Sequence, residues 1–394
     1  MIQRNFAPHL RRLLRAFPVV TILGPRQCGT TTFVRTTLAG WTYLDLERPS
    51  VAEPFEADPE ARLGQVGNRI VLDEALRCPS IFPVLRSLVD DRRSRTGRCV
   101  LLGSAAPSLV RGISESLAGR TAFLDLAPLR FDEVVRTEPD LSVAWFRGGY
   151  PTAFLETDDR VRSEWFEGYV RAFVERDLPA LGVEVTSTTM RKLWAMLAHS
   201  NGGIWNASQI AASIGVSYHT VDRYLDILEQ SFLVRRLPPW SSNLGKRLVK
   251  SPKVHFRDTG LLHHFLGIDR RQTLDVHPGR GASFEAFVID HVISAVGRTT
   301  PGARFSHFRT AAGVEADLVV ETGGRAVPFE IKVKSAPRRD DADPLRSVMS
   351  DLGAPAGFLV HGGTENYSLG GGVRAVSAAW LLASVRRVAG ALRG

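Results

Sequence analysis

Short apolar runs alternate with stretches of helical spacing over the first third of the chain. The apolar runs are "VVTILG" (19–24), "TYLDL" (42–46), "NRIVLDEA" (68–75), "GRCVLLGSA" (97–105) and "TAFLDLAPL" (121–129). Runs without polar alternation, separated by helices, are typical of strands buried on both faces of a parallel sheet. We therefore predict an α/β domain with a parallel five-stranded sheet over residues 1–128.

Helical spacing dominates from residue 129 onward. "VRSEWFEGYVRAFVERDL" (161–178) repeats its apolar positions every three or four residues, as an amphipathic helix does. "NASQIAASIGVSYHTVDRYLDILEQSFLVRRL" (206–237) then predicts a helix, a turn at Gly215 and Val216, a second helix and an extended segment. This order is typical of a helix-turn-helix with a wing, so we predict a helical and winged-helix domain over residues 129–275.

The last third predicts a separate α/β unit. Its pattern is a helix (281–297), a strand (304–310), a hairpin (314–334) turning at Gly323 and Gly324, a helix (342–352) and a strand (356–361). This is the element order of the restriction-endonuclease-like fold. We predict such a domain over residues 276–394.

Composition limits the classes of protein that the chain can belong to. A length of 394 residues, 44% of them hydrophobic, predicts two or three globular domains. Cys28, Cys78 and Cys99 are isolated, which excludes the paired spacing of zinc sites and indicates a reducing compartment. No apolar run reaches the length of a membrane span. We expect a cytoplasmic protein without a membrane partner.

The formal net charge of +9 comes far more from arginine than from lysine. Arginine favours planar contacts to phosphate, so DNA is a candidate partner. An arginine-rich protein without such a partner would show the same balance, and both interpretations stay open.

A glycine-bracketed turn follows the first predicted strand. In "GPRQCGTTTF", Gly24 and Gly29 are separated by four residues, the spacing of a phosphate-binding P-loop, but the lysine position holds Thr30. Such a loop gathers backbone N–H groups around an anion at the start of a helix. We expect the nucleotide to contact residues of this segment, namely Gly24, Pro25, Arg26, Gln27, Cys28, Gly29, Thr30, Thr31 and Thr32.

Two later strands end in residues that suit a nucleotide site. "IVLDEA" ends in Asp73 and Glu74, which predicts an Mg²⁺ site shared by Thr31 and Asp73 and a water-polarising role for Glu74. "VLLGSA" places Ser104 where it would orient that water. Open parallel sheets bind ligands at the carboxyl ends of their strands, where all three motifs lie.

These residues carry a resemblance to a known family. "GPRQCGTTTF", "LDEAL", "LLGSAAPSL", "SESLAGR", "GGYP" and "ERDLPALG" resemble the bacterial and archaeal AAA+ ATPases of the AAA_14/DUF4143 type. The resemblance implies ATP and Mg²⁺ as cofactors and a homo-oligomer in which Arg120 is an arginine finger for a neighbouring subunit. The alternative for Arg120 is a surface arginine at a helix end.

Thr30 departs from the pattern of this family. A lysine there would contact the β- and γ-phosphates, and a hydrogen bond to a charged group contributes about 1.5 to 3 kcal/mol, or about one to two decades in affinity. Arg26 offers charge from within the loop, although such a position usually points away from the phosphates. We expect weak nucleotide binding and slow or absent hydrolysis.

The second helix of the helix-turn-helix has polar outward positions. These are Ser217, Tyr218, His219, Thr220 and Arg223, residue types that contact phosphates or base edges in a major groove. A winged helix used for protein packing is the alternative.

Charged residues recur on the predicted C-terminal elements. Glu285 lies on the helix, Asp317 on the first hairpin strand, and Glu330 and Lys332 share one face of the second. The set resembles the PD-(D/E)xK nucleases, which implies that Asp317 and Glu330 bind Mg²⁺ and that all four residues are catalytic. The alternative is that these charged residues simply lie on a solvent-exposed edge of the hairpin, where the same residue types are common.

The sequence thus predicts a DNA-associated, ATP-binding AAA+ protein with a degenerate P-loop. The alternative is a metal-dependent DNA nuclease regulated by the nucleotide-binding domain. A scaffold role for the C-terminal domain and a nucleotide-free structural assembly also stay open.

Overall fold

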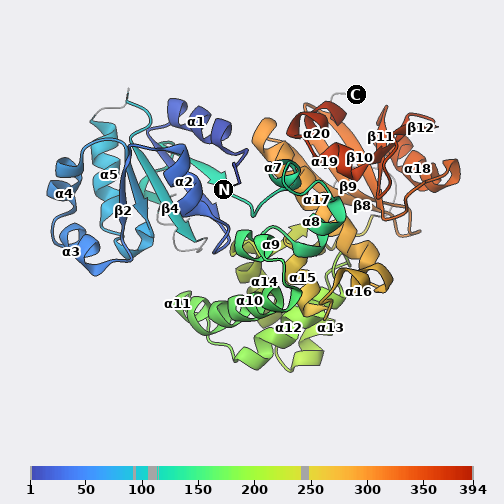
Figure 1. Cartoon of the computed structure of the whole chain (residues 1–394), viewed down its shortest axis with the longest axis horizontal. Coiled ribbons are helices and arrows are strands. Elements are labelled where there is room, and N and C mark those ends of the chain that lie inside the picture. The colour runs from blue at the N-terminus through green and yellow to red at the C-terminus, as the bar shows by residue number, and fades with distance from the viewer. Residues whose placement is uncertain (1, 92–94, 105–112, 114, 241–247, 393–394) are drawn as a thin grey trace. The chain divides into compact units, whose positions relative to one another are not determined.

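The computed structural model describes residues 2–91, 95–104, 113, 115–240 and 248–392, with only the backbone of Ser104 (Figure 1). The chain divides into two compact units. The first comprises Met1–Pro128 with the short segments Ala180–Val183 and Gln230–Phe232, and the second comprises Leu129–Pro179, Glu184–Glu229 and Leu233–Gly394. The domain boundary predicted at residue 275 falls within the second unit and stays a prediction.

The first unit contains a five-stranded sheet in the order β2-β3-β4-β1-β5. All four strand pairs are parallel. The strands are β1 (Val19–Gly24), β2 (Thr42–Asp45), β3 (Ile70–Asp73), β4 (Cys99–Ser104) and β5 (Thr121–Asp125). The predicted parallel five-stranded α/β domain is confirmed.

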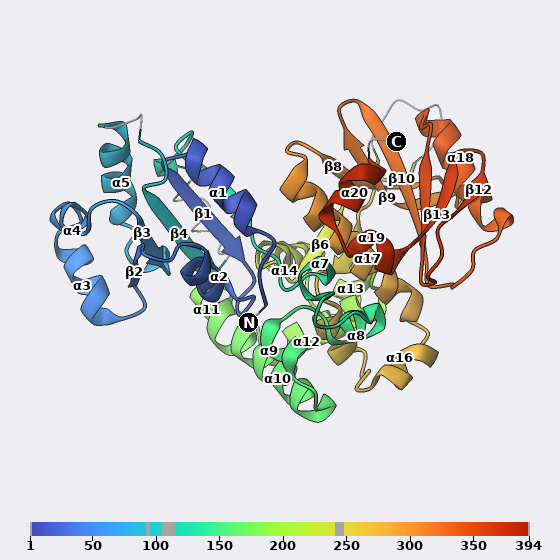
Figure 2. The same ribbon diagram turned by 45° about the horizontal axis from the view of Figure 1, so that its top comes forward.

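Helices cover both faces of this sheet, as Figure 2 shows with α1 and α2 on one side and α3, α4 and α5 on the other. Alternate strand residues enter the two cores: Val19 and Leu23 face one, and Val20 and Ile22 face the other. The strands are apolar on both faces for this reason. The helices are α1 (Ala7–Ala16), α2 (Thr30–Thr37), α3 (Pro49–Ala57), α4 (Pro59–Val66), η1 (Ala75–Arg77) and α5 (Ile81–Asp90).

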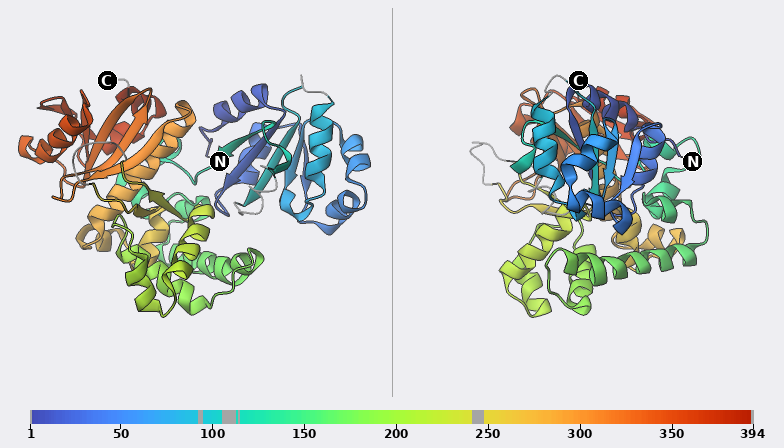
Figure 3. Two further views of the ribbon diagram at one scale, coloured as in Figure 1. Left: turned by 180° about the vertical axis from the view of Figure 1, so that it is seen from behind. Right: turned by 90° about the vertical axis from the view of Figure 1, so that its left-hand side faces the viewer.

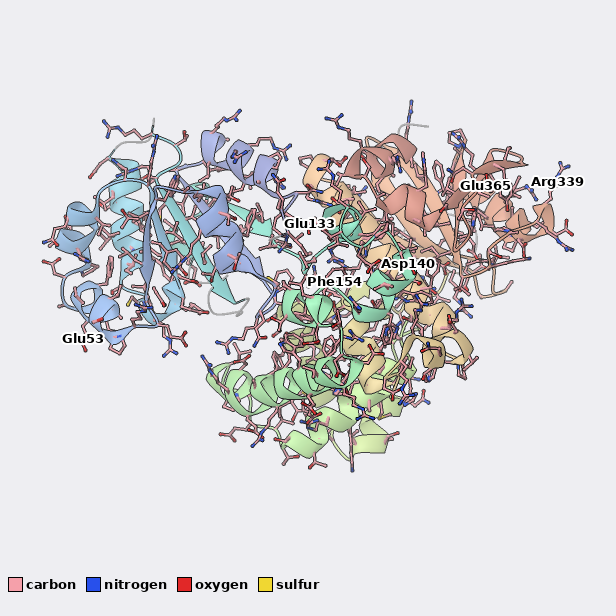
Figure 4. All side chains as sticks on the ribbon, in the orientation of Figure 1. Glu53, Glu133, Asp140, Phe154, Arg339 and Glu365 are labelled. Carbon is pink, nitrogen blue, oxygen red and sulfur yellow. The ribbon has the colours of Figure 1, made fainter. Side chains whose placement is uncertain are left out.

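The second unit begins with helices. They are α7 (Phe131–Val134), α8 (Leu141–Arg147), α9 (Pro151–Leu155), α10 (Asp159–Ala172), the π-helical η2 (Phe173–Asp177), α11 (Leu178–Ala180) and α12 (Ser187–His199). Glu133, labelled in Figure 4, accepts a hydrogen bond from the Arg130 backbone amide (3.0 Å) and so caps the start of α7. Polar caps of this kind satisfy amides that a helix leaves open at its start.

A helix, a turn and a second helix follow at the predicted positions. α13 (Ala207–Ile214) ends at Gly215, whose φ of 74° provides the left-handed turn into α14 (Tyr218–Gln230). Ile210, Val221 and Leu225 are buried between the elements. β6 (Val234–Leu237) then pairs antiparallel with β7 (Lys253–Phe256).

The C-terminal part of the second unit is a mixed six-stranded sheet in the order β12-β13-β11-β10-β9-β8, coloured orange to red in Figure 3. α17 packs against β9 and β10, and α18 packs against β9, β10 and β11. The strands are β8 (Arg304–Arg309), β9 (Glu315–Thr322), β10 (Arg325–Lys332), β11 (Gly357–His361), β12 (Tyr367–Gly370) and β13 (Val373–Ser377). The remaining helices are α15 (Thr259–Phe265), α16 (Arg271–Val276), α17 (Arg280–Thr299), η3 (Arg339–Ala342), α18 (Asp343–Leu352), α19 (Ala378–Leu382) and α20 (Val385–Ala391).

This sheet confirms the predicted second α/β fold at the C-terminal end of the chain. The hairpin of β9 and β10 turns at Gly323 and Gly324, both of which have positive φ. The short strands β12 and β13 were not predicted, because each is only four or five residues long and glycines 370–372 lie at the end of the first and between the two. Across the described residues, the structure contains no helix that is both long and apolar enough to cross a membrane.

Candidate functional site

The loop between β1 and α2 has the backbone of a phosphate-binding turn. Gln27 (φ 60°) and Gly29 (φ 91°) are both in the left-handed region, and α2 begins directly after Gly29. A side chain at Gly24 would place its Cβ 2.5 Å from the Leu126 carbonyl oxygen, so the loop leaves the sheet where only glycine fits. Left-handed residues at a helix start bring successive N–H groups around an anion.

The underside of the loop is fixed by a residue that the sequence did not indicate. The Arg4 guanidinium donates to the Cys28 carbonyl (3.0 Å) and also to the Ala127 carbonyl beyond β5. Cys28 is fully buried, and its thiol donates to the Leu126 carbonyl (3.6 Å). Arg4 lies more than 20 positions from either partner in the sequence, so no local sequence pattern predicts these contacts.

Thr30, at the position of the P-loop lysine, contacts another residue of the same loop. Its hydroxyl lies 3.2 Å from the Cys28 thiol, within hydrogen-bonding distance for sulfur. Burial raises the pKa of the Cys28 thiol, although the hydrogen bond with Thr30 lowers it. The thiol is therefore protonated at neutral pH, and the side chain at this position brings no charge to the loop.

The residues predicted to hold Mg²⁺ are adjacent. The Thr31 hydroxyl donates to Asp73 Oδ2 (3.1 Å), and the other Asp73 oxygen accepts the Glu74 backbone amide (3.0 Å). The Tyr43 hydroxyl also donates to Asp73, and burial together with this carboxylate raises the pKa of Tyr43. A hydroxyl and a carboxylate are hard oxygen ligands of the kind that Mg²⁺ takes, so these residues fit the ion.

Glu74 follows with a strained backbone. Its φ of 53° is left-handed, and burial, followed by the charge of Asp73, raises its pKa. The charge of Arg26 lowers the same pKa, which places the loop arginine near Glu74. A carboxylate with a raised pKa beside a metal ligand is suited to accept a proton from water.

Ser104 and Arg120 lie at opposite ends of the parallel strands, Ser104 at the carboxyl end of β4 and Arg120 before the amino end of β5. The strand register pairs Ser104 with Gly24 of the P-loop, and the residues that follow it, 105–112, lie outside the described part of the chain. Arg120 directly precedes β5 and donates through Nε and Nη2 to the two Asp90 oxygens, both at 2.8 Å. This ion pair raises the pKa of Arg120. The finger role of Arg120 stays a prediction.

The four C-terminal residues named from the sequence form one largely buried side-chain cluster with Lys253, which we call the C-terminal acidic pocket. Lys253 Nζ lies 3.1 Å from Glu285 Oε1 and 3.4 Å from Asp317 Oδ1. The other Asp317 oxygen accepts the Ile331 amide (2.8 Å), and Lys332 donates to Glu330 (2.8 Å). Lys253 is the first residue of β7, and no motif in the sequence singled it out.

Burial dominates the electrostatics of this pocket. Burial and the charge of Asp317 raise the pKa of Glu285 to about 8 and that of Glu330 to about 7. Burial also raises the pKa of Asp317, although Lys253 lowers it. Burial and then Lys253 lower the pKa of His255 to about 3, so its imidazole is neutral.

The C-terminal pocket does not fit Mg²⁺ as its side chains lie. In the part of the chain that the structure describes, no three His, Cys, Asp or Glu side chains are arranged to hold a metal ion. The positive charge that meets Glu285 and Asp317 is the ammonium group of Lys253. The nuclease role of Glu285, Asp317, Glu330 and Lys332 stays a prediction.

The helix-turn-helix presents part of its predicted polar face to solvent. Tyr218 is 49% exposed, and His219 and Arg223 are also exposed. The Ser217 hydroxyl accepts the Thr220 amide (3.1 Å), so Ser217 caps α14. The stretch "GKRLVKSPK" (245–253), which follows the helix-turn-helix, contains four lysine or arginine residues, and its residues 245–247 lie outside the described part of the chain.

Three families match successive parts of the chain. The family described as an AAA domain matches residues 16–135, and two domains of unknown function, DUF8612 and DUF4143, match residues 138–272 and 280–381. Together with the P-loop and the Thr31–Asp73 pair, the first match defines an ATP-binding protein of the P-loop ATPase class.

Relatives extend the match over nearly the whole chain. An uncharacterised protein of Mycobacterium tuberculosis is 41% identical over 384 residues, which cover 96% of this chain and 84% of the relative. An uncharacterised protein of Haemophilus influenzae is 24% identical over 43% of this chain and 46% of the relative. The chain belongs to the family of AAA-domain proteins with a C-terminal DUF4143 domain, which includes the mycobacterial protein.

A solved structure is also similar to this chain. The Walker-type ATPase of Pyrococcus abyssi aligns with a TM-score of 0.47 at 13% identity, covering 67% of this chain and 95% of that one.

Proposed function

We propose that the N-terminal domain holds ATP and Mg²⁺ and hydrolyses the nucleotide slowly or not at all. The observation that carries this proposal is the contact of Thr30 with Cys28. In P-loop enzymes a lysine ammonium cradles the β- and γ-phosphates while charge develops on the transferred group. Here the residue at that position is neutral and bonded to the loop itself.

The parts of the site that would bind ATP before any hydrolysis do not depend on the missing lysine. The left-handed loop, the start of α2 and the Thr31–Asp73 pair supply backbone donors and metal ligands. Losing one charge-assisted hydrogen bond costs about one to two decades in affinity. Losing a group aimed at transition-state charge costs about 10²- to 10³-fold in turnover. Binding thus survives better than hydrolysis, and the site favours a long-lived ATP state over rapid cycling.

Equilibrium binding measurements with ATP test the first claim of this proposal, that the site still holds ATP and Mg²⁺. Isothermal titration of the full chain with ATP should show one site whose affinity rises when Mg²⁺ is added. Asp73→Asn should remove the effect of Mg²⁺ and leave the metal-free affinity within about twofold, because backbone donors do not depend on Asp73. A wild-type chain with no measurable ATP binding would contradict the proposal.

We also propose that α14 contacts duplex DNA. The proposal rests on the exposure of Tyr218, His219 and Arg223 on the second helix of a helix-turn-helix and on the net charge of +9. Arg223→Ala should weaken DNA binding and reduce its salt dependence by about one phosphate contact. Arg325→Ala, at an exposed arginine on a hairpin turn, is the matched control. Equal effects of the two variants would favour the alternative, a helix pair used for protein packing.

Arg120 could contribute to hydrolysis only in an oligomer, as an arginine finger for the nucleotide of a neighbouring subunit. Its bidentate pair with Asp90 occupies the guanidinium, so an arginine-finger role requires that this pair open. In a homo-oligomer, Arg120→Ala would lower residual hydrolysis without changing ATP affinity. A surface arginine would change neither quantity.

A further inference from the structure

We propose that Lys253 is a built-in counter-cation of the C-terminal acidic pocket, so that this pocket binds no divalent metal ion in the natural chain. The inference concerns the second unit alone and is independent of the proposed nucleotide function. It rests on where Lys253 Nζ lies, how its backbone is held, and which polar atoms surround it.

The ammonium group lies between the acids of two different elements. It is 3.1 Å from Glu285 of α17 and 3.4 Å from Asp317 of β9, and Lys253 is only 3% exposed. A second ammonium, from Lys332, lies 2.8 Å from Glu330. Three carboxyl groups thus face two ammonium groups, and a divalent ion would have to enter beside two positive charges. Charges of like sign repel strongly where little water screens them.

The backbone of Lys253 is held from both sides, so the side chain is not on a movable loop end. Lys253 pairs with Leu237 of β6 on one side and forms a bridge with Ile204 on the other. The next residue, Val254, exchanges hydrogen bonds with Gly202 and Gly203 at 2.8 and 3.2 Å. Pairing on two sides fixes the Cα of Lys253 beside the acids, and its buried side chain places the ammonium group between Glu285 and Asp317.

Unsatisfied polar atoms line the same pocket. His255, two positions along β7, is 2% exposed, and its Nε2 lies 3.9 Å from Glu285 Oε1. Among the described residues, neither ring nitrogen of His255 nor Glu330 Oε2 has a hydrogen-bond partner. A neutral imidazole and carboxylate oxygens are metal ligands. The pocket therefore contains metal-ligand atoms that, among the described residues, are not arranged around a common metal position, and the ammonium of Lys253 lies between two of the acids.

This arrangement makes a specific prediction about a single substitution. Lys253→Met removes the ammonium and keeps a side chain of similar length, which leaves Glu285 and Asp317 without a counter-charge. The variant should gain an Mn²⁺ site, and the site should vanish when Asp317→Asn is added. The same Asp317→Asn change in a chain that retains Lys253 should leave Mn²⁺ binding unchanged.

Mn²⁺ titration followed by electron paramagnetic resonance measures the site without any assay of activity. All chains carry Asp73→Asn and are nucleotide-free, so that the P-loop contributes no metal site. A gain of at least tenfold in Mn²⁺ affinity for Lys253→Met, reversed by Asp317→Asn, supports the proposal. A folded Lys253→Met chain that binds no Mn²⁺ overturns it.

The chain that retains Lys253 provides an arm that does not depend on the folding of Lys253→Met. Mn²⁺ binding that is lost on Asp317→Asn or Glu285→Gln in this chain overturns the proposal, whereas binding unaffected by both supports it. A thermal scan adds a second readout, because Mn²⁺ should raise the melting temperature of Lys253→Met and leave that of the Lys253-containing chain unchanged.

Discussion

The hydroxyl of Thr30 lies 3.2 Å from the thiol of Cys28, so the side chain at the lysine position of the P-loop is bonded to the loop that should bind phosphate. The next residue, Thr31, instead points its hydroxyl at Asp73. Two neighbouring threonines at the start of α2 thus have separate roles. Thr30 bonds within the loop, and Thr31 contacts the carboxylate that we propose as its partner in binding Mg²⁺.

Removing the Thr31 hydroxyl should affect only the Mg²⁺-dependent part of ATP binding. Thr31→Ala deletes the donor to Asp73 Oδ2 and one of the two predicted Mg²⁺ ligands. We expect the gain in ATP affinity on adding Mg²⁺ to fall about tenfold or more, since metal ligands typically contribute at least this much. Titrations with and without Mg²⁺ measure the gain. Thr37→Ala, at the other end of α2, is the control and should keep it.

Gly148, in "GGYP", should tolerate no side chain. Its φ is +74°, and a Cβ there would lie 2.6 Å from the Gly260 amide nitrogen and against the Asp258 carboxylate. That carboxylate also accepts the Gly149 amide (2.7 Å). Gly148→Ala should lower the free energy of unfolding by about 2 to 4 kcal/mol through backbone strain and overpacking.

Gly168 provides the matched control for this substitution. It lies within α10, and a Cβ there meets nothing within 4 Å. Gly168→Ala should raise the free energy of unfolding by about 0.5 to 1 kcal/mol, because alanine is the better helix former. Urea unfolding measures both variants, and equal effects would show that the packing around Gly148 has been misjudged.

The acidic pocket should make stability depend on pH. Burial and Asp317 raise the pKa of Glu285 from 4.5 to about 8, and burial raises that of Glu330 to about 7. The folded chain therefore holds these protons more tightly than the unfolded chain does. The free energy of unfolding falls as pH rises, between about 4.5 and 8 for Glu285 and between about 4.5 and 7 for Glu330.

Glu285→Gln should flatten this dependence. The amide cannot ionise, so one of the two contributions to the slope disappears while Glu330 keeps the other. Glu365→Gln, at the exposed position labelled in Figure 4, is the control and should leave the slope unchanged. Denaturant unfolding at about pH 5 and about pH 8 gives the slopes, and an unchanged slope in Glu285→Gln would contradict the assignment.

The local pattern of apolar and polar residues predicted the helices and strands, but it did not predict contacts between residues that are distant in the sequence. The apolar runs predicted the five parallel strands. Motif spacing predicted that Thr31 and Asp73 are close, and the Thr31 hydroxyl lies 3.1 Å from Asp73 Oδ2. Arg4 and Lys253 contact partners more than 20 positions away, and no motif in the sequence singled out either residue. Tyr43 on β2 was likewise missed, because its contact with Asp73 requires knowing that β2 lies beside β3.

The C-terminal pocket shows how a motif can be placed correctly and still leave its chemistry open. Strand periodicity and helix spacing placed Glu285, Asp317 and Glu330 on elements that bring them together. The sequence alone did not show that a lysine from β7 enters between two of them. Charge neutralisation of this kind depends on tertiary position, and a search for acidic residues alone overlooks it.

Hydrolysis by the wild-type chain and by Thr30→Lys, measured side by side, tests the central claim most directly. Single-turnover assays with saturating Mg²⁺ and ATP separate turnover from affinity, and Glu74→Gln in the lysine background shows that any gain arises at this site. We predict that Thr30→Lys hydrolyses ATP about 10²-fold faster than the wild type or more, since the lysine stabilises charge in the transition state. Equal turnover of the two chains would contradict the claim that Thr30 leaves a site that holds nucleotide without efficient hydrolysis.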